Sequence, residues 1–373
     1  MELSAESIVS RASKHTLGYI LIISSAALFA LTHVIGKPLL EDANFGIEIN
    51  PIALVATIYI INGLFFTPLA KNAEPIKNIG RRNLILITLI GIIEVSALIS
   101  YFFGLKESTA VNASIFSNGE IIFSLLIAIT IFKERLHKKE LTPFFMIIFG
   151  MMILPISYDF WLHGMALSDL VIGDLLIIFS GLLYAIDVNI CKYVSDRVSS
   201  NRITQLVSFT AGGFALALLI AFQIPYEITW EQLAPISLIA ILGTGLATLF
   251  FLISLRLIGA VRTVLIYSTT SVFGIIFSAI ILAEQITLIN IVSIVTVMTG
   301  IYFLRKRFGE EHSEINQSKI ISKEIVKNEN DYKMKLKQLH WRRLDSFMKI
   351  LTNYVKRKTI IFLFNHVQTF DGG

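Results

Sequence analysis

The feature that most constrains the fold is an internal duplication. At an offset of 150 residues Glu134 aligns with Glu284, and at an offset of 155 residues Lys37 aligns with Lys192. Each copy carries five apolar segments, and a unit that crosses a membrane five times ends on the side opposite its start. The second copy must therefore run through the membrane in the inverted orientation. Inverted repeats of this kind surround one central site in many secondary transporters.

The composition places the chain in a membrane. Hydrophobic residues make up 54% of it, charged residues only 16%, and the mean hydropathy is +0.71, all outside the range of ordinary soluble proteins. A membrane-spanning helix needs roughly 20 mainly apolar residues. Ten apolar stretches of about this length follow one another: 17–36, 51–70, 84–105, 110–132, 141–157, 171–192, 203–222, 235–255, 260–283 and 287–304. Because the runs are continuous rather than alternating, they favour helices over a membrane barrel. We therefore predict an all-α integral membrane protein of the cell membrane, with ten transmembrane helices in two inverted five-helix repeats, residues 17–157 and 171–304.

The distribution of Lys and Arg predicts the orientation. Basic residues precede the first segment and follow every even-numbered one, whereas the connections 157–170, 223–234 and 283–290 contain none. Because short cytoplasmic loops are enriched in Lys and Arg, both termini are predicted to be cytoplasmic, including the N-terminal segment 1–16. The hairpin FKERLHKKE in the first copy is basic, but its counterpart LAEQITLIN has lost every basic residue. This difference supports the inversion independently.

The ordered pattern of motifs resembles a known family. In each copy the fourth segment closes on an acidic residue, in KERL at 133–136 and AEQI at 283–286, and the first segment ends in VIGKPLL at 34–40. Ten helices in two inverted copies with these motifs resemble the drug/metabolite transporter superfamily and, within it, the EamA-like transporters, over about residues 15–305. The resemblance implies a permease that moves a small metabolite, amino acid or drug-like compound, often outward, by alternating access.

Two glutamates near the middle of membrane segments are the main functional candidates. A charged side chain at such a depth costs about 2.5–3.5 kcal/mol on insertion scales, so we expect Glu94 and Glu120 to have a specific role. They could bind a cationic group of a substrate or titrate to couple transport to protons; the alternative is a protonated acid that joins helices by hydrogen bonds. Their repeat counterparts are Thr244 and Thr270, which predicts a site that is charged in one half and hydroxyl-lined in the other. The family's proline step after the glutamate is absent, since Ile121 follows Glu120.

Polar residues within one turn of Glu120, and their repeat counterparts, complete the predicted site. Ser117 and Asn118 precede Glu120, and Tyr267 is the counterpart of Ser117 within the polar run YSTTS at 267–271. Hydroxyl groups inside a membrane also bond to their own or a neighbouring helix. Both roles are open for these side chains.

Four further polar residues lie inside or at the ends of the apolar segments. His33 and Lys37 share one face of a helix; a titratable histidine suits a proton step, and the alternatives are a structural hydrogen bond for His33 and an interfacial anchor for Lys37. Asn62 could serve either substrate binding or helix contact. Asp187 is expected to pair with Lys192.

Enzymatic signatures are absent from the sequence. It contains no phosphate-binding glycine loop, no Cys/His ligand spacing and no HExxH or GxSxG motif. We therefore expect no enzymatic activity, no cofactor and no metal site. Glu134 and Glu284, at the membrane surface, are expected to cap or brace their hairpins.

Residues 305–373 differ in character from the rest. They hold 15 Lys or Arg and 8 Asp or Glu, so the whole net charge of +5 belongs to this tail and does not point to nucleic acid. Apolar residues recur at helical spacing from about 334 to 358, which predicts a basic amphipathic helix that binds anionic lipid headgroups or, alternatively, a protein partner. The alternative function is a transporter-fold scaffold or sensor that acts through this tail, and a channel is a third. The chain could form a homo-oligomer in each case.

Overall fold

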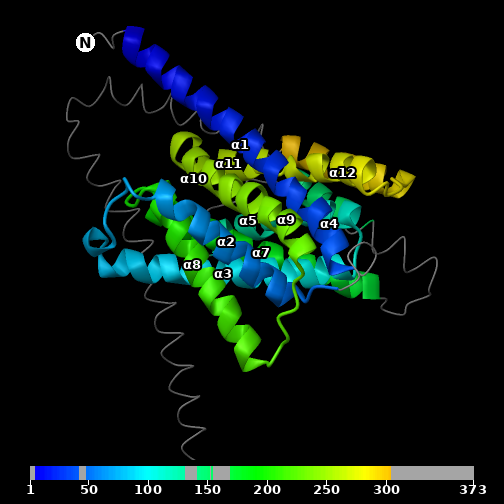
Figure 1. Ribbon diagram of the computed structural model, residues 1–373. Helices are drawn as coiled ribbons and strands as arrows, with labels where there is room; N and C mark the ends of the chain where they lie inside the picture. The colour runs from blue at the N-terminus through cyan, green and yellow to red at the C-terminus, as the bar shows by residue number, and fades with distance from the viewer. Residues whose placement is uncertain (1–4, 42–47, 131–140, 152, 154–168, 304–373) are drawn as a thin grey trace, which may run out of the picture. The chain divides into compact units, whose positions relative to one another are not determined.

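Helices make up all of the regular structure in the described part of the chain. The computed structural model describes residues 5–41, 48–130, 141–151, 153 and 169–303 (Figure 1). The helices of the first copy are α1 Ala5–Leu40, α2 Pro51–Leu69, the short η1 Ile76–Asn78, α3 Arg81–Lys106, α4 Ala110–Phe116, α5 Gly119–Thr130 and a helix at Leu141–Met151. Those of the second copy are α7 Asp169–Ser195, α8 Ser200–Ala221, α9 Trp230–Leu238, the π-helical η2 Ile239–Leu246, α10 Ala247–Ile258, α11 Ala260–Tyr267, α12 Thr270–Ile281 and a helix at Leu288–Phe303. The prediction of an all-α chain is confirmed for these residues.

Within the described ranges, seven helices are long and apolar enough to cross a membrane. They are Thr16–Leu40, Pro51–Leu69, Arg81–Lys106, Ile172–Ser195, Ser200–Ala221, Trp230–Ile258 and Arg262–Ile281. The other three predicted segments are also helical where they are described, but the fourth is divided into α4 and α5, and the fifth and tenth are shorter apolar helices. Residues 154–157 of the fifth segment, the hairpin at 131–140 with Glu134, and the tail at 304–373 lie outside the described residues.

Local signals in the sequence set the helix starts. The side chain of Asn50 accepts a hydrogen bond from the backbone N–H of Ile52 at 2.9 Å, and Pro51 occupies the first helical position of α2, where no N–H is needed. The hydroxyl of Thr109 likewise accepts from the N–H of Asn112 at 3.0 Å and caps α4. For α2 and α4, the capping residue is therefore supplied by the connection that precedes the helix.

The helix packing repeats the duplication. α3 packs against α7, and the counterpart of α3 in the second copy, formed by η2 and α10, packs against α1, the counterpart of α7. Each crossing uses small residues. A Cβ on Gly104 would lie 2.5 Å from the carbonyl oxygen of Gly173, and at the equivalent crossing Ser254 Oγ donates to the carbonyl of Gly18 at 3.0 Å. α2 packs against α8, joining the two copies a third time.

Both copies break their fourth segment at the same repeat position. α4 gives way to α5, and about 150 residues later α11 gives way to α12, without a proline at either break. The side chains of Ser117, Asn118, Ser268 and Thr269 each donate to the carbonyl three residues earlier, at 2.6–2.9 Å. Such side-chain bonds compete with the regular helix ladder. The family's proline step is therefore replaced by polar side chains that bond to their own backbone.

Candidate functional site

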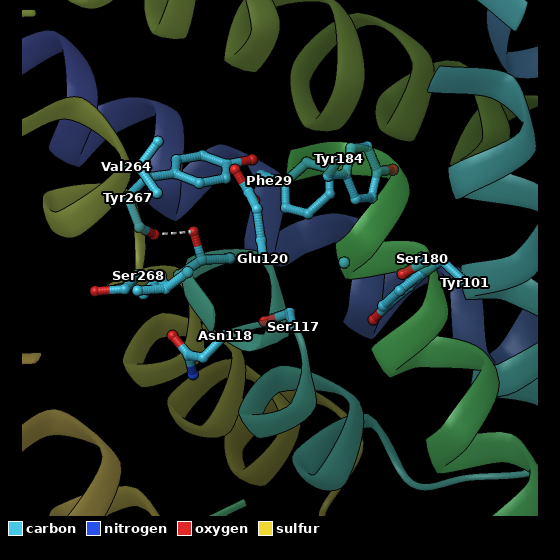
Figure 2. A pocket seen from close by; sticks show the side chains of 13 residues that line it. Phe29, Tyr101, Ser117, Asn118, Glu120, Ser180, Tyr184, Val264, Tyr267 and Ser268 are labelled. Carbon is cyan, nitrogen blue, oxygen red and sulfur yellow. Dashed lines mark hydrogen bonds between the residues drawn. The ribbon is translucent and has the colours of Figure 1, made fainter. Parts of the chain in front are cut away.

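A pocket lies where the two helix breaks meet α1, α3 and α7. It has about 530 Å³ of space between its lining atoms, a value that includes its open mouth. One group of lining residues is aromatic: Phe29, Tyr101, Tyr184 and Tyr267. A second group is small and polar: Ser117, Asn118, Ser180, Ser268 and Thr270. Glu120 is the one carboxylic acid among the described lining residues (Figure 2).

The aromatic walls come from both copies. Phe29 and Tyr184 are repeat counterparts at the offset of 155, and their rings meet edge to face with centroids 6.3 Å apart. Phe29 also contacts the ring of Tyr267 at 5.7 Å. The aromatic group thus lies on the boundary between the two copies. Its ring faces can attract a cation held within about 6 Å.

Glu120 occupies the first turn of α5, where the helix dipole favours a negative charge. Its side chain is only 8% exposed, and its Oε1 has no hydrogen-bond partner. The backbone of α7 fixes its position, since a Cβ on Gly181 would lie 2.8 Å from the N atom of Glu120. The carboxyl of Glu120 and the rings of Phe29 and Tyr267 turn toward the same part of the pocket (Figure 2). Among the described residues no Lys, Arg or His lies within ion-pair distance of it.

Five of the ten predicted site residues line this pocket. They are Glu120, Ser117, Asn118, Tyr267 and Thr270. Asn118 also joins the two copies, because its Nδ2 donates to Ser271 Oγ at 2.8 Å while its Oδ1 remains without a partner. The repeat comparison therefore brought together residues 150 positions apart that share one site.

Three other predicted residues are placed around the pocket rather than in it. His33 is fully buried, with its Nδ1 hydrogen-bonded to the hydroxyl of Tyr101, a pocket-lining residue, and its Nε2 unpartnered. Lys37 donates to the carbonyls that end α3, at 2.9 and 3.0 Å, and forms an ion pair with Glu41 at 2.7 Å. Asn62 Nδ2 donates to Ser208 Oγ at 2.9 Å, between α2 and α8.

Glu94 and Thr244 also lie outside the pocket lining. Glu94 accepts a hydrogen bond from the hydroxyl of Tyr59 at 3.1 Å, and the hydroxyl of Thr244 in η2 is buried without a partner. The charge of Glu94 interacts with that of Asp187, which enters from α7.

The expected pairing of Asp187 with Lys192 is wrong. Lys192 instead donates to the carbonyl of Leu255 at 3.2 Å and pairs with Asp196 at 3.6 Å, the repeat equivalent of the contacts of Lys37. Asp187 accepts from Cys191 Sγ at 3.6 Å. The spacing of five residues sends the Asp187 and Lys192 side chains to different faces of α7.

Glu284 caps a helix of the other copy rather than its own hairpin. This helix is α4, and the two carboxylate oxygens of Glu284 accept from the N–H groups of Ala110 and Val111 at 3.0 and 2.9 Å. The aromatic residues Phe29, Tyr101 and Tyr184 were missed by sequence reasoning, although the coincidence of Phe29 with Tyr184 in the repeat alignment could have identified two of them. In the described part of the chain no three His, Cys, Asp or Glu side chains gather as metal ligands.

Comparison with known proteins agrees with this arrangement. The EamA-like transporter family matches residues 16–155 and 171–306, one match for each copy. The chain is 27% identical over 301 residues to an uncharacterized transporter of Methanothermobacter thermautotrophicus, covering 77% of this chain and 85% of that protein. A solved structure described only as the crystal structure of a protein aligns with a TM-score of 0.56 at 14% identity, over 78% of this chain and 96% of its own, and so shares the fold. The two matched repeats, the apolar spanning helices and the central pocket together show that the chain is a multi-pass cell-membrane protein that belongs to the EamA-like transporter family.

Proposed function

We propose that this transporter carries a small organic cation by alternating access, with the pocket around Glu120 as its substrate site. The observation that carries the proposal is a buried carboxyl without an ionic partner, enclosed by aromatic rings at the junction of two broken helices. Discontinuous helices of this kind form substrate sites at the repeat interface of other transporters.

The pocket chemistry favours an amine or quaternary ammonium group. A buried carboxylate needs a positive partner, and the faces of Phe29, Tyr184 and Tyr267 attract the same charge. Ser117 and Asn118 offer hydrogen bonds to a polar remainder of the substrate. Metabolites, amino acids and drug-like compounds all include members with such a cationic group.

Matched contacts at the helix ends support alternating access. Lys37 holds the carbonyl end of α3 and pairs with Glu41, and Lys192 holds the carbonyl end of α10 and pairs with Asp196. In an inverted arrangement of ten helices with cytoplasmic termini, the contacts of Lys37 and the equivalent contacts of Lys192 lie on opposite sides of the membrane. If the contacts of one lysine open while those of the other stay closed, the pocket becomes accessible from each side of the membrane in turn.

Counterflow in proteoliposomes tests this proposal. Vesicles loaded with unlabelled phenyltrimethylammonium should accumulate the labelled compound transiently and saturably. Tetramethylammonium and phenethylamine should compete, whereas neutral tert-butanol should not. Glu120→Gln should lower the counterflow rate by at least tenfold, because the neutral amide no longer balances the cation.

The matched control is Glu227→Gln, which removes an exposed carboxyl from a connection between helices. It should transport like the parent. Absence of saturable counterflow with all three cations, or full counterflow by Glu120→Gln, would contradict the proposal.

A further inference from the structure

The crossing of α3 and α7 contains a second group of buried acids. The two helices run antiparallel, because Ser108 Oγ donates to Asp174 Oδ1 at 2.5 Å near one end and the guanidinium of Arg82 lies 5.3 Å from the ring centre of Tyr193 near the other. Between these contacts each helix carries one carboxylic acid. This arrangement fixes the register of the two acids.

The register places Glu94 beside Asp187. Glu94 lies fourteen residues before Ser108 and Asp187 lies thirteen residues after Asp174, and at 1.5 Å per residue both positions are about 20 Å from the Ser108–Asp174 contact. If both carboxyl groups were ionised at these positions, they would repel each other. One acid comes from each copy of the repeat.

The equivalent crossing of α1 with η2 has hydroxyls at the same two positions. Thr32 is the repeat counterpart of Asp187, and Thr244 is the counterpart of Glu94. A Cβ on Gly243 would lie 2.6 Å from Thr32 Oγ1, and both threonine hydroxyls are buried without a partner. The fold therefore forms this crossing with neutral side chains, and the two acids are not required by the packing.

The two acids are buried almost without partners. Glu94 is 7% exposed and receives one hydrogen bond, from Tyr59; Asp187 is 8% exposed and is bonded only to Cys191, with its Oδ1 unpartnered. The hydroxyl and thiol are neutral donors. Neither supplies a counter-charge.

Among the residues that the structure describes, the helices packed around the pair supply no counter-charge either. The other ionisable groups that interact with the pair are Tyr59 of α2, Tyr184 and Cys191 of α7, Tyr267 of α11, and Glu120 of α5. The basic side chains of these and the neighbouring helices are engaged elsewhere or lie at helix ends. His33 bonds Tyr101, Lys37 and Lys192 bond carbonyls at the ends of α3 and α10, and Arg202 and Arg256 bond the carbonyls of Ala70 and Val198. Arg81 and Arg82 lie at the start of α3, and Arg262 lies in the first turn of α11. Two ionised carboxylates would therefore face each other in the described structure without compensation, which one bound proton relieves.

We propose that Glu94 and Asp187 share one exchangeable proton and form a coupling site separate from the substrate pocket. The proposal rests on the proposed function for its role in transport, but the proton site itself does not. The pair belongs to the interface between the copies, so a movement of one copy against the other changes its surroundings.

Tyr184 connects this site to the pocket. It lines the pocket, and its charge interactions include Glu94, Asp187 and Glu120. A cation bound at Glu120 repels the shared proton, which then leaves to water on the side where the site is open. Return of the proton from the other side favours release of the cation there. The result is exchange of one cation for one proton.

Infrared titration of the purified protein tests the proton site directly. Glu94→Thr/Asp187→Thr installs the hydroxyls of the equivalent crossing and should fold, as checked by its gel-filtration profile. It should lose a pH-dependent protonated-carboxyl C=O band that the parent shows. The control Glu227→Gln/Glu231→Gln removes two exposed carboxyls and should keep that band.

The single variants provide a second test in case the double variant does not fold. Glu94→Gln or Asp187→Asn should retain one carboxyl and shift the midpoint of the band to lower pH, because a neutral neighbour replaces a charged one. An unchanged band in the double variant, or unchanged midpoints in both single variants, would overturn the proposal.

Transport gives the second measurement. Uptake of phenyltrimethylammonium should rise with an opposing pH gradient in the parent, and this response should disappear in Glu94→Thr/Asp187→Thr. A variant that keeps the response would refute the coupling role. Failure of the parent to exchange any cation would refute the proposed function alone, because the infrared titration needs no substrate.

Discussion

Replacement of Gly104 by Ala tests whether the α3–α7 crossing is as close as the structure indicates. The added Cβ would lie 2.5 Å from the carbonyl oxygen of Gly173 and 3.0 Å from the N atom of Ile177. Both are backbone atoms, which cannot rotate away. The helices must therefore separate by about half an ångström before the contact reaches even the 3.0 Å lower limit of real Cβ contacts.

The expected magnitude follows from two opposing effects. Alanine stabilises a helix relative to glycine by about 1 kcal/mol, whereas forcing an extra carbon into a packed interface costs about 1–3 kcal/mol. The control is Gly213→Ala in α8, where nothing lies within 4 Å of the new Cβ and only the first effect acts. Gly104→Ala should therefore be less stable than Gly213→Ala by about 1–3 kcal/mol.

The assay is unfolding of both variants in one detergent–lipid mixture, followed by near-ultraviolet circular dichroism. A Gly104→Ala protein as stable as Gly213→Ala would refute the reasoning and with it the register of α3 against α7. Because that register places Glu94 beside Asp187, the same result would remove the geometric basis of the proton site.

Two further predictions concern side chains that cap helices. Glu284→Gln keeps one acceptor for Ala110 and Val111 but removes the charge at the start of α4, and should cost about 1–2 kcal/mol in the same unfolding assay; equal stability would show that the cap is not charge-assisted. For Glu74, partial burial acts to raise the pKa, but hydrogen bonds from Ser199 and the charge of Arg202 outweigh it and hold the pKa below the ordinary 4.5. Ionised Glu74 therefore stabilises the fold at neutral pH, and this contribution is lost as the pH falls through the folded-state pKa. Glu74→Gln should unfold at a lower temperature than the parent at pH 7 but not at pH 3, and a pH-independent difference would contradict this linkage.

The repeat and the helical character of the chain could be predicted from the sequence because both depend on local composition. The same repeat offset paired Ser117 with Tyr267 and Glu120 with Thr270, and all four line one pocket. Symmetry gives this information without any knowledge of packing, because equivalent positions that lie close to the axis relating the inverted copies meet at their common interface.

What could not be predicted depends on contacts between distant residues. The role of Lys37 is set by carbonyls at the end of α3, 68 and 69 positions away, which no local pattern shows. At the helix breaks, the hydroxyl groups of Ser117 and Ser268 bond to carbonyls of their own helix rather than to a neighbouring helix. The sequence pairs Asp187 with Lys192, whereas in the structure Asp187 accepts a hydrogen bond from Cys191 and Lys192 pairs with Asp196.

The most direct test of alternating access uses a single cysteine in the pocket. Cys191→Ser removes the one native thiol while keeping a hydrogen-bond donor for Asp187, and Ser117→Cys then places a new thiol in the pocket lining. A membrane-impermeant thiol reagent should label this cysteine from either face of oriented vesicles, and phenyltrimethylammonium should slow labelling from both. Labelling from one face only, under all conditions, would contradict the account.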